Sequence, residues 1–332
     1  MNFILGFLSG LASVALLIIF AGGYIGYFFS LTRRKTKIQL QKPDPEAELK
    51  VNLKDELKAQ GEAYMFGLNP EDVELKARDG LTLRGYFFPA PQPTDKMVVL
   101  SHGYRNHGPG EWSVFIQFYH EVLGWNILVP DHRAHGRSDG KRIAFAALEW
   151  QDLYDWIEAF QGRCEGEPIV ALHGISMGAA TVLNCNVHTP PACVKTIVED
   201  CGFTNGYEMI WLAGHRDMHL HLPLTFWGLA FWYRVLNGVS LKKASDPFGN
   251  IEKFKLPTLF IHGAADGFVP TEMGHRLYEA ATVEKDCLFI PEAAHAMAYI
   301  IGKEAYEAKL LEWYGKYMGE KAAAQAVYSK LT

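Results

Sequence analysis

Six short apolar runs, spaced along the chain from residue 97 onward, constrain the fold most strongly. Each run is six or seven residues long and rich in β-branched side chains; the runs cover 97–103, 126–131, 168–174, 194–200, 257–263 and 286–291. Near-continuous apolar runs of this length are typical of strands buried on both faces of a parallel sheet. Helix-compatible segments such as 111–124 and 145–160 separate them. The alternation predicts right-handed βαβ units in an open α/β sheet.

Two further runs precede the first of these strands. Residues 71–77 and 81–90 alternate apolar and polar side chains around Arg78-Asp79-Gly80. Asp-Gly between two alternating runs indicates a tight turn between antiparallel strands. We therefore expect a hairpin to open the globular part of the chain.

The N-terminus is predicted to be a transmembrane helix, residues 1–31. No charged side chain occurs from Asn2 to Leu31, a span longer than the ~20 residues that cross a bilayer. A cleaved signal peptide is the alternative, but it carries its basic residues before a shorter apolar core. Here Arg33, Arg34, Lys35 and Lys37 follow the run. The positive-inside rule then favours a cytoplasmic domain, with an extracytoplasmic one as the alternative.

The remaining chain divides into three predicted parts. Residues 32–70 read as a basic juxtamembrane segment and a linker helix, 71–318 as the main domain, and 319–332 as a C-terminal tail. A net charge of −5 gives no reason to expect nucleic acid as a partner. The five cysteines show no C-x-x-C spacing, so neither a disulfide framework nor a zinc site is indicated.

The sequence Gly174-Ile175-Ser176-Met177-Gly178 follows one predicted strand directly and leads into a helix-compatible run. This strand, turn and helix context is what a nucleophile elbow requires. On such an elbow the serine adopts an unfavourable backbone conformation, and glycine two residues to either side relieves crowding. Gly-x-Ser-x-Gly alone is also compatible with an ordinary turn, so the interpretation depends on the rest of the chain.

A serine hydroxyl needs a base and an orienting carboxylate to become a nucleophile. Asp266 lies just past the strand at 257–263, and His295 lies just past the last strand. The chain order serine, acid, histidine and the positions at carboxyl ends of strands predict a Ser176, Asp266, His295 catalytic triad. Asp139 and Asp200 are the alternative carboxylates.

The motifs "SHGY", "DHRAHGRSDG", "GISMG", "IHGAADGFVP" and "AAH" together resemble the α/β-hydrolase superfamily of serine hydrolases, including its bacterial membrane-anchored esterase-like or peptidase-like members. The resemblance implies a mostly parallel eight-stranded sheet with helices on both faces and an acyl-enzyme mechanism. It also implies an oxyanion hole formed by the backbone N–H groups of Tyr104 and Met177. The loop at 131–140 is then a scaffold, and Arg105, Asn106 and His107 either contact substrate or only order their loop.

The interval between the strands ending at Asp200 and starting at Pro257 is too long for one crossover helix. On the resemblance it is a helical cap over about 202–250. Its aromatic side chains suit an apolar pocket, a bilayer surface or packing of the cap on the body; they are Tyr207, Trp211, Phe226, Trp227, Phe231, Trp232 and Tyr233. His215 and His219 have helical i, i+4 spacing without an assured third ligand, so we expect no metal.

These features predict a membrane-tethered serine hydrolase that cleaves small-molecule carboxylic esters, with acyl or lipid-like substrates favoured. No cofactor motif occurs, and a serine mechanism needs none. Amide cleavage on peptides and acyl transfer use the same triad and remain alternatives. A membrane-attached binding module without catalysis is the alternative from another class.

Overall fold

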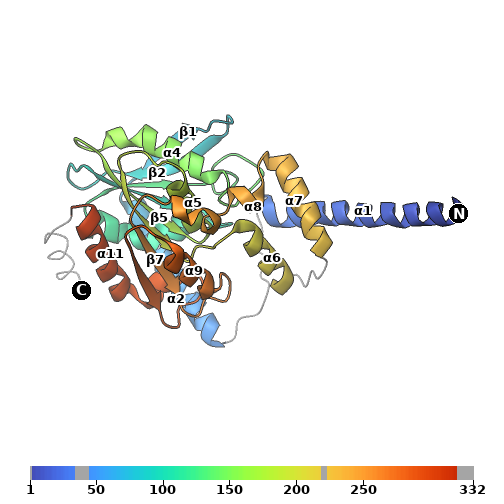
Figure 1. Ribbon diagram of the computed structural model, residues 1–332. Coiled ribbons are helices and arrows are strands. Elements are labelled where there is room, and N and C mark those ends of the chain that lie inside the picture. The colour runs from blue at the N-terminus through green and yellow to red at the C-terminus, as the bar shows by residue number, and fades with distance from the viewer. Residues whose placement is uncertain (1, 34–44, 218–222, 320–332) are drawn as a thin grey trace.

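The computed structural model describes residues 2–33, 45–217 and 223–319. Its centre is an eight-stranded sheet in the order β1-β2-β4-β3-β5-β6-β7-β8 (Figure 1). The strands are β1 Glu71–Lys76, β2 Thr82–Phe88, β3 Lys96–Ser101, β4 Asn126–Pro130, β5 Ile169–Ile175, β6 Val194–Asp200, β7 Thr258–Gly263 and β8 Lys285–Ile290. Pairs β1/β2 and β2/β4 are antiparallel and the other pairs are parallel. The predicted fold class is confirmed.

Helices cover both faces of this sheet because successive side chains of a strand point to opposite sides. In β3, Val98 and Leu100 belong to a core with α3 and α11, whereas Met97 and Val99 pack with α4 and α5. The helices of the body are α3 Gly108–Gln117, α4 Glu149–Phe160, α5 Met177–Val187, α9 Thr271–Ala280, α10 Ala298–Ile301 and α11 Lys303–Tyr317, with a π-helix at Phe118–Val122 and a 3-10 helix at Gln161–Arg163. Both faces of the central strands are therefore buried.

The predicted linker helix, α2 Pro45–Gly67, packs on the body through α3. Met65 is fully buried in the core beneath α3. A Cβ atom at Gly61 would lie 2.7 Å from the backbone of Ser113, so the two helices approach closely. Lys54 donates to the carbonyl oxygen of Ala296 at 3.1 Å. This helix therefore contributes to the core as well as linking two parts of the chain.

The N-terminal helix α1, Asn2–Leu31, projects from the body and packs by its inner end against α7, Pro223–Asn237 (Figure 1). Over Phe7–Leu31 it is long and apolar enough to cross a membrane. The two helices touch at Gly23 and Gly228, where a Cβ atom on Gly23 would lie 2.2 Å from the backbone of Gly228. Trp232 Nε1 donates to the carbonyl of Phe20 at 2.8 Å. Small residues permit this contact, as they do between membrane helices.

The last carbonyl groups of α1 are bound by the body. A helix end leaves four such groups without partners in its own ladder. Arg105 Nη2 donates to Phe29 O at 2.5 Å, the Tyr104 hydroxyl donates to Ser30 O, and Ile143 N donates to Leu31 O at 2.8 Å. The guanidinium group also suits the negative end of the helix dipole. The inner end of α1 is thus an integral part of the main domain.

Helices fill the interval between β6 and β7: α6 Gly206–Asp217, α7, α8 Leu241–Ala244 and a 3-10 helix at Phe248–Lys253. Phe226 and Tyr233 are buried, whereas Trp227 and Phe231 are exposed. Some of the aromatic side chains in this interval therefore pack inside the protein, and others lie on its surface. His219 and His221 lie outside the described residues.

Candidate active site

Ser176 lies on a sharp bend between β5 and α5. Its backbone has φ 58° and ψ −117°, a region that favours glycine, which confirms the strained conformation expected from the motif. A Cβ atom on Gly174 would lie 2.2 Å from Gly178 O, and one on Gly178 would lie 1.9 Å from Ser101 O. Only glycine fits at either position, which leaves the serine as the side chain at the tip of the bend.

The structure brings Ser176, His295 and Asp266 together from three separate loops. His295, between β8 and α10, places Nε2 2.9 Å from Ser176 Oγ. Its Nδ1 lies 2.7 Å from Asp266 Oδ2, in the loop between β7 and α9. Both distances are hydrogen-bonding distances. The arrangement can remove a proton from the serine hydroxyl and stabilise the imidazolium that forms.

Asp266 is held as an anion. Burial acts to raise the pKa of this carboxyl group, but hydrogen bonds with His262 and His295 outweigh burial and hold the pKa below its ordinary value. Its other oxygen, Oδ1, accepts from the backbone N–H groups of Phe268 and Val269 at 2.8 and 2.9 Å. His262 Nε2 lies 3.4 Å from Oδ2. Sequence reasoning missed His262, although it precedes Asp266 by four residues in the same motif.

The two alternative carboxylates lie elsewhere. Asp139 pairs with Arg84 of β2 at 3.1 Å, and both side chains are partly exposed. Asp200 is buried and accepts a hydrogen bond from the Tyr306 hydroxyl at 2.9 Å. In the part of the chain that the structure describes, neither is hydrogen-bonded to His295, whereas Asp266 is.

Tyr104 and Met177 both lie close to Ser176. Met177 begins α5 directly after Ser176. Tyr104 follows Gly103, whose added Cβ would lie 3.3 Å from Ser176 Cβ. The Met177 side chain is buried, and the Tyr104 ring packs edge-on against Phe145 at 5.5 Å between ring centroids.

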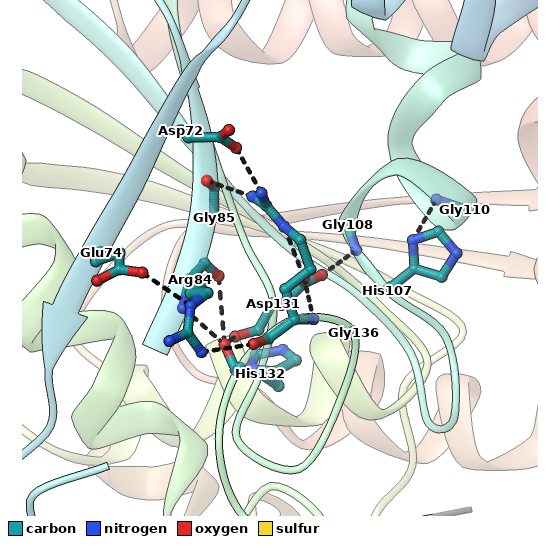
Figure 2. Close-up of polar contacts among 12 residues, drawn as sticks. Asp72, Glu74, Arg84, Gly85, His107, Gly108, Gly110, Asp131, His132 and Gly136 are labelled. Atoms are coloured by element: carbon teal, nitrogen blue, oxygen red, sulfur yellow. Dashed lines mark hydrogen bonds and ion pairs between the residues drawn. The ribbon is translucent and has the colours of Figure 1, made fainter. Parts of the chain in front are cut away.

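The loop at 131–140 forms a scaffold. Figure 2 shows Asp131 between Gly108, at the N-terminus of α3, and the tip of the loop. Asp131 Oδ1 accepts from Gly108 N at 2.8 Å and Oδ2 accepts from Arg137 N at 2.8 Å. His132 Nε2 lies 2.9 Å from Ser101 Oγ. These contacts tie the loop, which directly follows β4, to the N-terminus of α3 and the end of β3, and they agree with the structural role expected for it.

The residues after Tyr104 also have structural partners. Arg105 binds the end of α1, and Asn106 donates to Glu111 Oε2 at 2.7 Å. His107 caps α3, because its Nδ1 accepts from Gly110 N at 3.2 Å (Figure 2). Of the two alternatives for this segment, ordering of the loop has direct support. Arg105 additionally lines the apolar pocket that opens at Ser176.

An apolar pocket of about 160 Å³ opens at Ser176. Phe145, Phe203 and Phe268 line its side within the body, and Met209 and Ile210 of α6 lie opposite. Phe29, Ser30 and Leu31, at the end of α1, complete the wall. Local sequence patterns carry no signal for this last contribution, because it depends on a contact between segments far apart in the chain. The site can accept an apolar acyl group beside a nucleophile.

One group of potential metal ligands coincides with the triad. Donor atoms of Cys201, Asp266 and His295 lie within 4.8 Å of one another. Burial holds the pKa of the Cys201 thiol well above its usual range, so it stays protonated and is a poor ligand. Asp266 and His295 are already hydrogen-bonded to each other. This donor set fits a triad better than a metal site.

The sheet order, the elbow at its centre and the loops at the carboxyl ends of its strands define one class of protein: the chain has the α/β-hydrolase fold. A family model described as serine aminopeptidase, S33, matches residues 92–205. The solved structure of the Pyrococcus furiosus esterase Pf2001 superposes with a TM-score of 0.63 at 20% identity, over 77% of this chain and 94% of that one.

Relatives by sequence include both characterised and uncharacterised proteins. The uncharacterized protein YqkD of Bacillus subtilis is 28% identical over 239 residues, which are 70% of this chain and 75% of that protein. The lysophosphatidylserine lipase ABHD12 of Danio rerio is 26% identical over 202 residues, which are 58% of this chain and 49% of the lipase. The chain is thus similar to proteins named as an esterase, a lipase and a peptidase.

Proposed function

We propose that this protein is a membrane-anchored serine hydrolase that cleaves carboxylic esters of apolar acyl groups through an acyl-enzyme. The observation that carries the proposal is the hydrogen-bonded series Ser176, His295, Asp266, beside an apolar pocket. An apolar pocket at a nucleophile favours an acyl group over a polar peptide. The esterase and lipase names among the similar proteins agree with ester hydrolysis.

In the proposed reaction His295 Nε2 accepts the Ser176 hydroxyl proton as Oγ attacks the acyl carbonyl. The same nitrogen then gives the proton to the leaving alkoxide, so that an alcohol departs and the acyl group stays on Ser176. A water molecule attacks the acyl-enzyme by the reverse proton transfers and releases the carboxylic acid. Asp266 orients the imidazole and stabilises its charged form. The backbone N–H groups of Tyr104 and Met177 are the proposed donors to the tetrahedral oxyanion.

We propose further that α1 remains attached and anchors the protein in a bilayer. Its outer residues are exposed and apolar, which requires an apolar surrounding. Its inner end, including the buried Tyr27 and Leu31, belongs to the core around the pocket. Cleavage as a signal peptide would remove part of this core. A cytoplasmic domain remains our expectation from the basic residues that follow α1.

A matched substrate panel tests the proposed chemistry. The purified full-length protein in detergent micelles is given p-nitrophenyl esters, the corresponding anilides and short peptides. We expect ester hydrolysis to dominate and Ser176→Ala to lower kcat at least about a thousandfold. Ser240→Ala is the control, because this side chain makes no capping hydrogen bond at α8. Preferred peptide or anilide cleavage would establish the amidase alternative instead.

A further inference from the structure

A second apolar groove continues from the pocket at Ser176 along the inner half of α1. Its volume is about 230 Å³. It shares Ser30, Ile210 and Gly214 with the pocket, so the two spaces adjoin. From there it extends along α1 to Ile18, between this helix and α7. The pocket at the serine alone is small for a ligand site, which typically has ~300 Å³ or more.

Glycines on α1 leave the room for this groove. Gly22 and Gly26 line it on one helix, and Thr225 and Leu229 line it on the other. The nearest atom to a Cβ added at Gly26 is Leu229 Cδ1 at 3.5 Å, an ordinary contact. A larger side chain at this position would therefore extend into the groove without meeting backbone. The lining is apolar apart from the hydroxyl groups of Ser30 and Thr225.

The length and direction of the groove match a membrane leaflet. Ile18 and Ser30 are twelve residues apart on one helix, which corresponds to ~18 Å along its axis. Half of the hydrocarbon core of a bilayer is ~15 Å thick. An acyl chain that lies in the groove would have its carbonyl end at Ser176 and its methyl end among lipid tails.

The outer surface of α7 carries an exposed apolar face, which indicates that the groove beside it lies in a bilayer. Leu224, Trp227, Phe231 and Val235 are all exposed, and their spacing of three, four and four residues puts them on one face of α7. Helices with an exposed apolar face of this kind insert at the membrane surface. With α7 inserted beside α1, the groove is enclosed between two lipid-facing helices.

We propose that the groove between α1 and α7 binds the acyl chain of a bilayer lipid whose ester carbonyl lies at Ser176. The membrane helix is then part of the substrate site, and the lipid reaches the serine from its leaflet without leaving the membrane. This inference rests on the proposed ester hydrolysis and specifies its substrate class, a lipid with a long acyl chain. Arg105 and Tyr104 hold the end of α1 against the pocket and so keep the two spaces continuous.

Two glycine variants of α1 test the inference by chain-length selectivity. Gly26→Leu fills the groove, whereas Gly10→Leu is the control, because nothing lies within 4 Å of a Cβ added at Gly10. The readout is the ratio of kcat/KM for p-nitrophenyl palmitate to that for p-nitrophenyl butyrate in mixed micelles. We expect Gly26→Leu to lower this ratio at least tenfold and Gly10→Leu to leave it at the wild-type value. An unchanged ratio in Gly26→Leu would overturn the inference.

A probe on the wild-type protein gives an independent answer if the variant folds poorly. A hexadecyl fluorophosphonate with a terminal diazirine is attached to the serine and then photolysed in phospholipid vesicles. We expect cross-links to residues 18–26 of α1 or 225–229 of α7. Cross-links confined to other parts of the body would contradict the groove. Failure of the proposed ester hydrolysis would give a different result from failure of the groove. The probe would then not react with Ser176, and Ser176→Ala would leave butyrate hydrolysis unchanged.

Discussion

At the scale of single residues, the bend that carries Ser176 depends on the close approach of backbone atoms at Gly174 and Gly178. Gly174 is required by the backbone of Gly178, four residues further along, and Gly178 is required by the backbone of Ser101 in β3. The spacing of these glycines in the motif reflects that crowding. Asp266 and His295 could be placed because parallel strands end at one edge of a sheet. The hydrogen bonds that join them to Ser176 in the structure are consistent with this placement, and their catalytic roles remain predictions. His262 and the end of α1 were missed, because nothing local distinguishes a buried histidine or a helix end that reaches a pocket.

The crowding at Gly178 gives a first prediction. A Cβ atom there would lie 1.9 Å from Ser101 O, so Gly178→Ala must displace backbone of β3 or α5. We expect Gly178→Ala to lower the free energy of unfolding by at least about 3 kcal/mol, or to prevent folding. Gly162→Ala, where nothing lies within 4 Å of the added Cβ, is the control and should stay close to wild type. Thermal unfolding in micelles measures both, and equal stability of the two variants would refute the steric argument.

Two buried carboxyl groups behind the site predict how stability depends on pH. Burial raises the pKa of Glu199 to about 7 and that of Asp200 to about 6. Between the ordinary value near 4 and these values the folded state binds more protons than the unfolded state. Stability therefore falls as pH rises through this window, for Glu199 by up to about 3 kcal/mol.

The corresponding experiment compares unfolding midpoints at pH 5 and pH 8. We expect the midpoint of the wild type to fall over this interval and that of Glu199→Gln to fall less. The glutamine oxygen can still accept from Gly202 N, as Glu199 Oε2 does at 2.9 Å. Glu165→Gln removes an exposed carboxylate and should keep the wild-type difference. A Glu199→Gln difference as large as that of the wild type would contradict the raised pKa.

At the scale of helices and strands, periodicity predicted the elements well and their partners less well. Strand boundaries agree with the predicted runs to within one or two residues, because runs buried on both faces differ sharply from their flanks. The predicted hairpin is present as β1 and β2. Helices α1 and α2 were predicted as an anchor and a linker, and the sequence did not indicate their contacts with the body. Glycine spacing permits close packing but does not say against what.

Two glycines of α2 test whether this helix is bound to the body. Gly61→Ala introduces a Cβ atom 2.7 Å from the backbone of Ser113, whereas nothing lies within 4 Å of a Cβ added at Gly67. In an isolated linker both changes would favour the helix by up to ~1 kcal/mol. We expect Gly61→Ala to be destabilising by about 1 to 3 kcal/mol and Gly67→Ala to be neutral or stabilising. Stabilisation by both substitutions would mean that α2 does not pack on α3.

At the scale of the whole molecule, the inner end of α1 and the α/β body pack together as one unit. Arg33 illustrates how the structure changes the interpretation of the sequence. Its guanidinium donates to Ser138 O at 2.7 Å and to Gly136 O, so this residue has a structural reason to be basic apart from membrane orientation. The orientation prediction then depends on Arg34, Lys35 and Lys37, which lie outside the described residues. A cytoplasmic domain therefore stays a prediction.

The retained anchor has its own test. We expect the protein expressed in cells to stay in the membrane fraction after extraction with alkaline carbonate, because a retained helix as long and apolar as α1 would hold it in the bilayer. Peptide mass spectrometry of this fraction should detect residues 2–31 in the extracted protein. A soluble product whose N-terminus begins after residue 31 would show that the segment is a signal peptide, and the groove between α1 and α7 would not exist in the mature protein.

The most direct test of the central claim is the site and rate at which a fluorophosphonate reacts with the folded protein. We expect a single covalent adduct, located by peptide mass spectrometry at Ser176. We also expect His295→Ala to slow this reaction at least about a hundredfold, since the hydroxyl then lacks its base. An unmodified Ser176 in the folded wild type, or labelling at the same rate in His295→Ala, would contradict the claim.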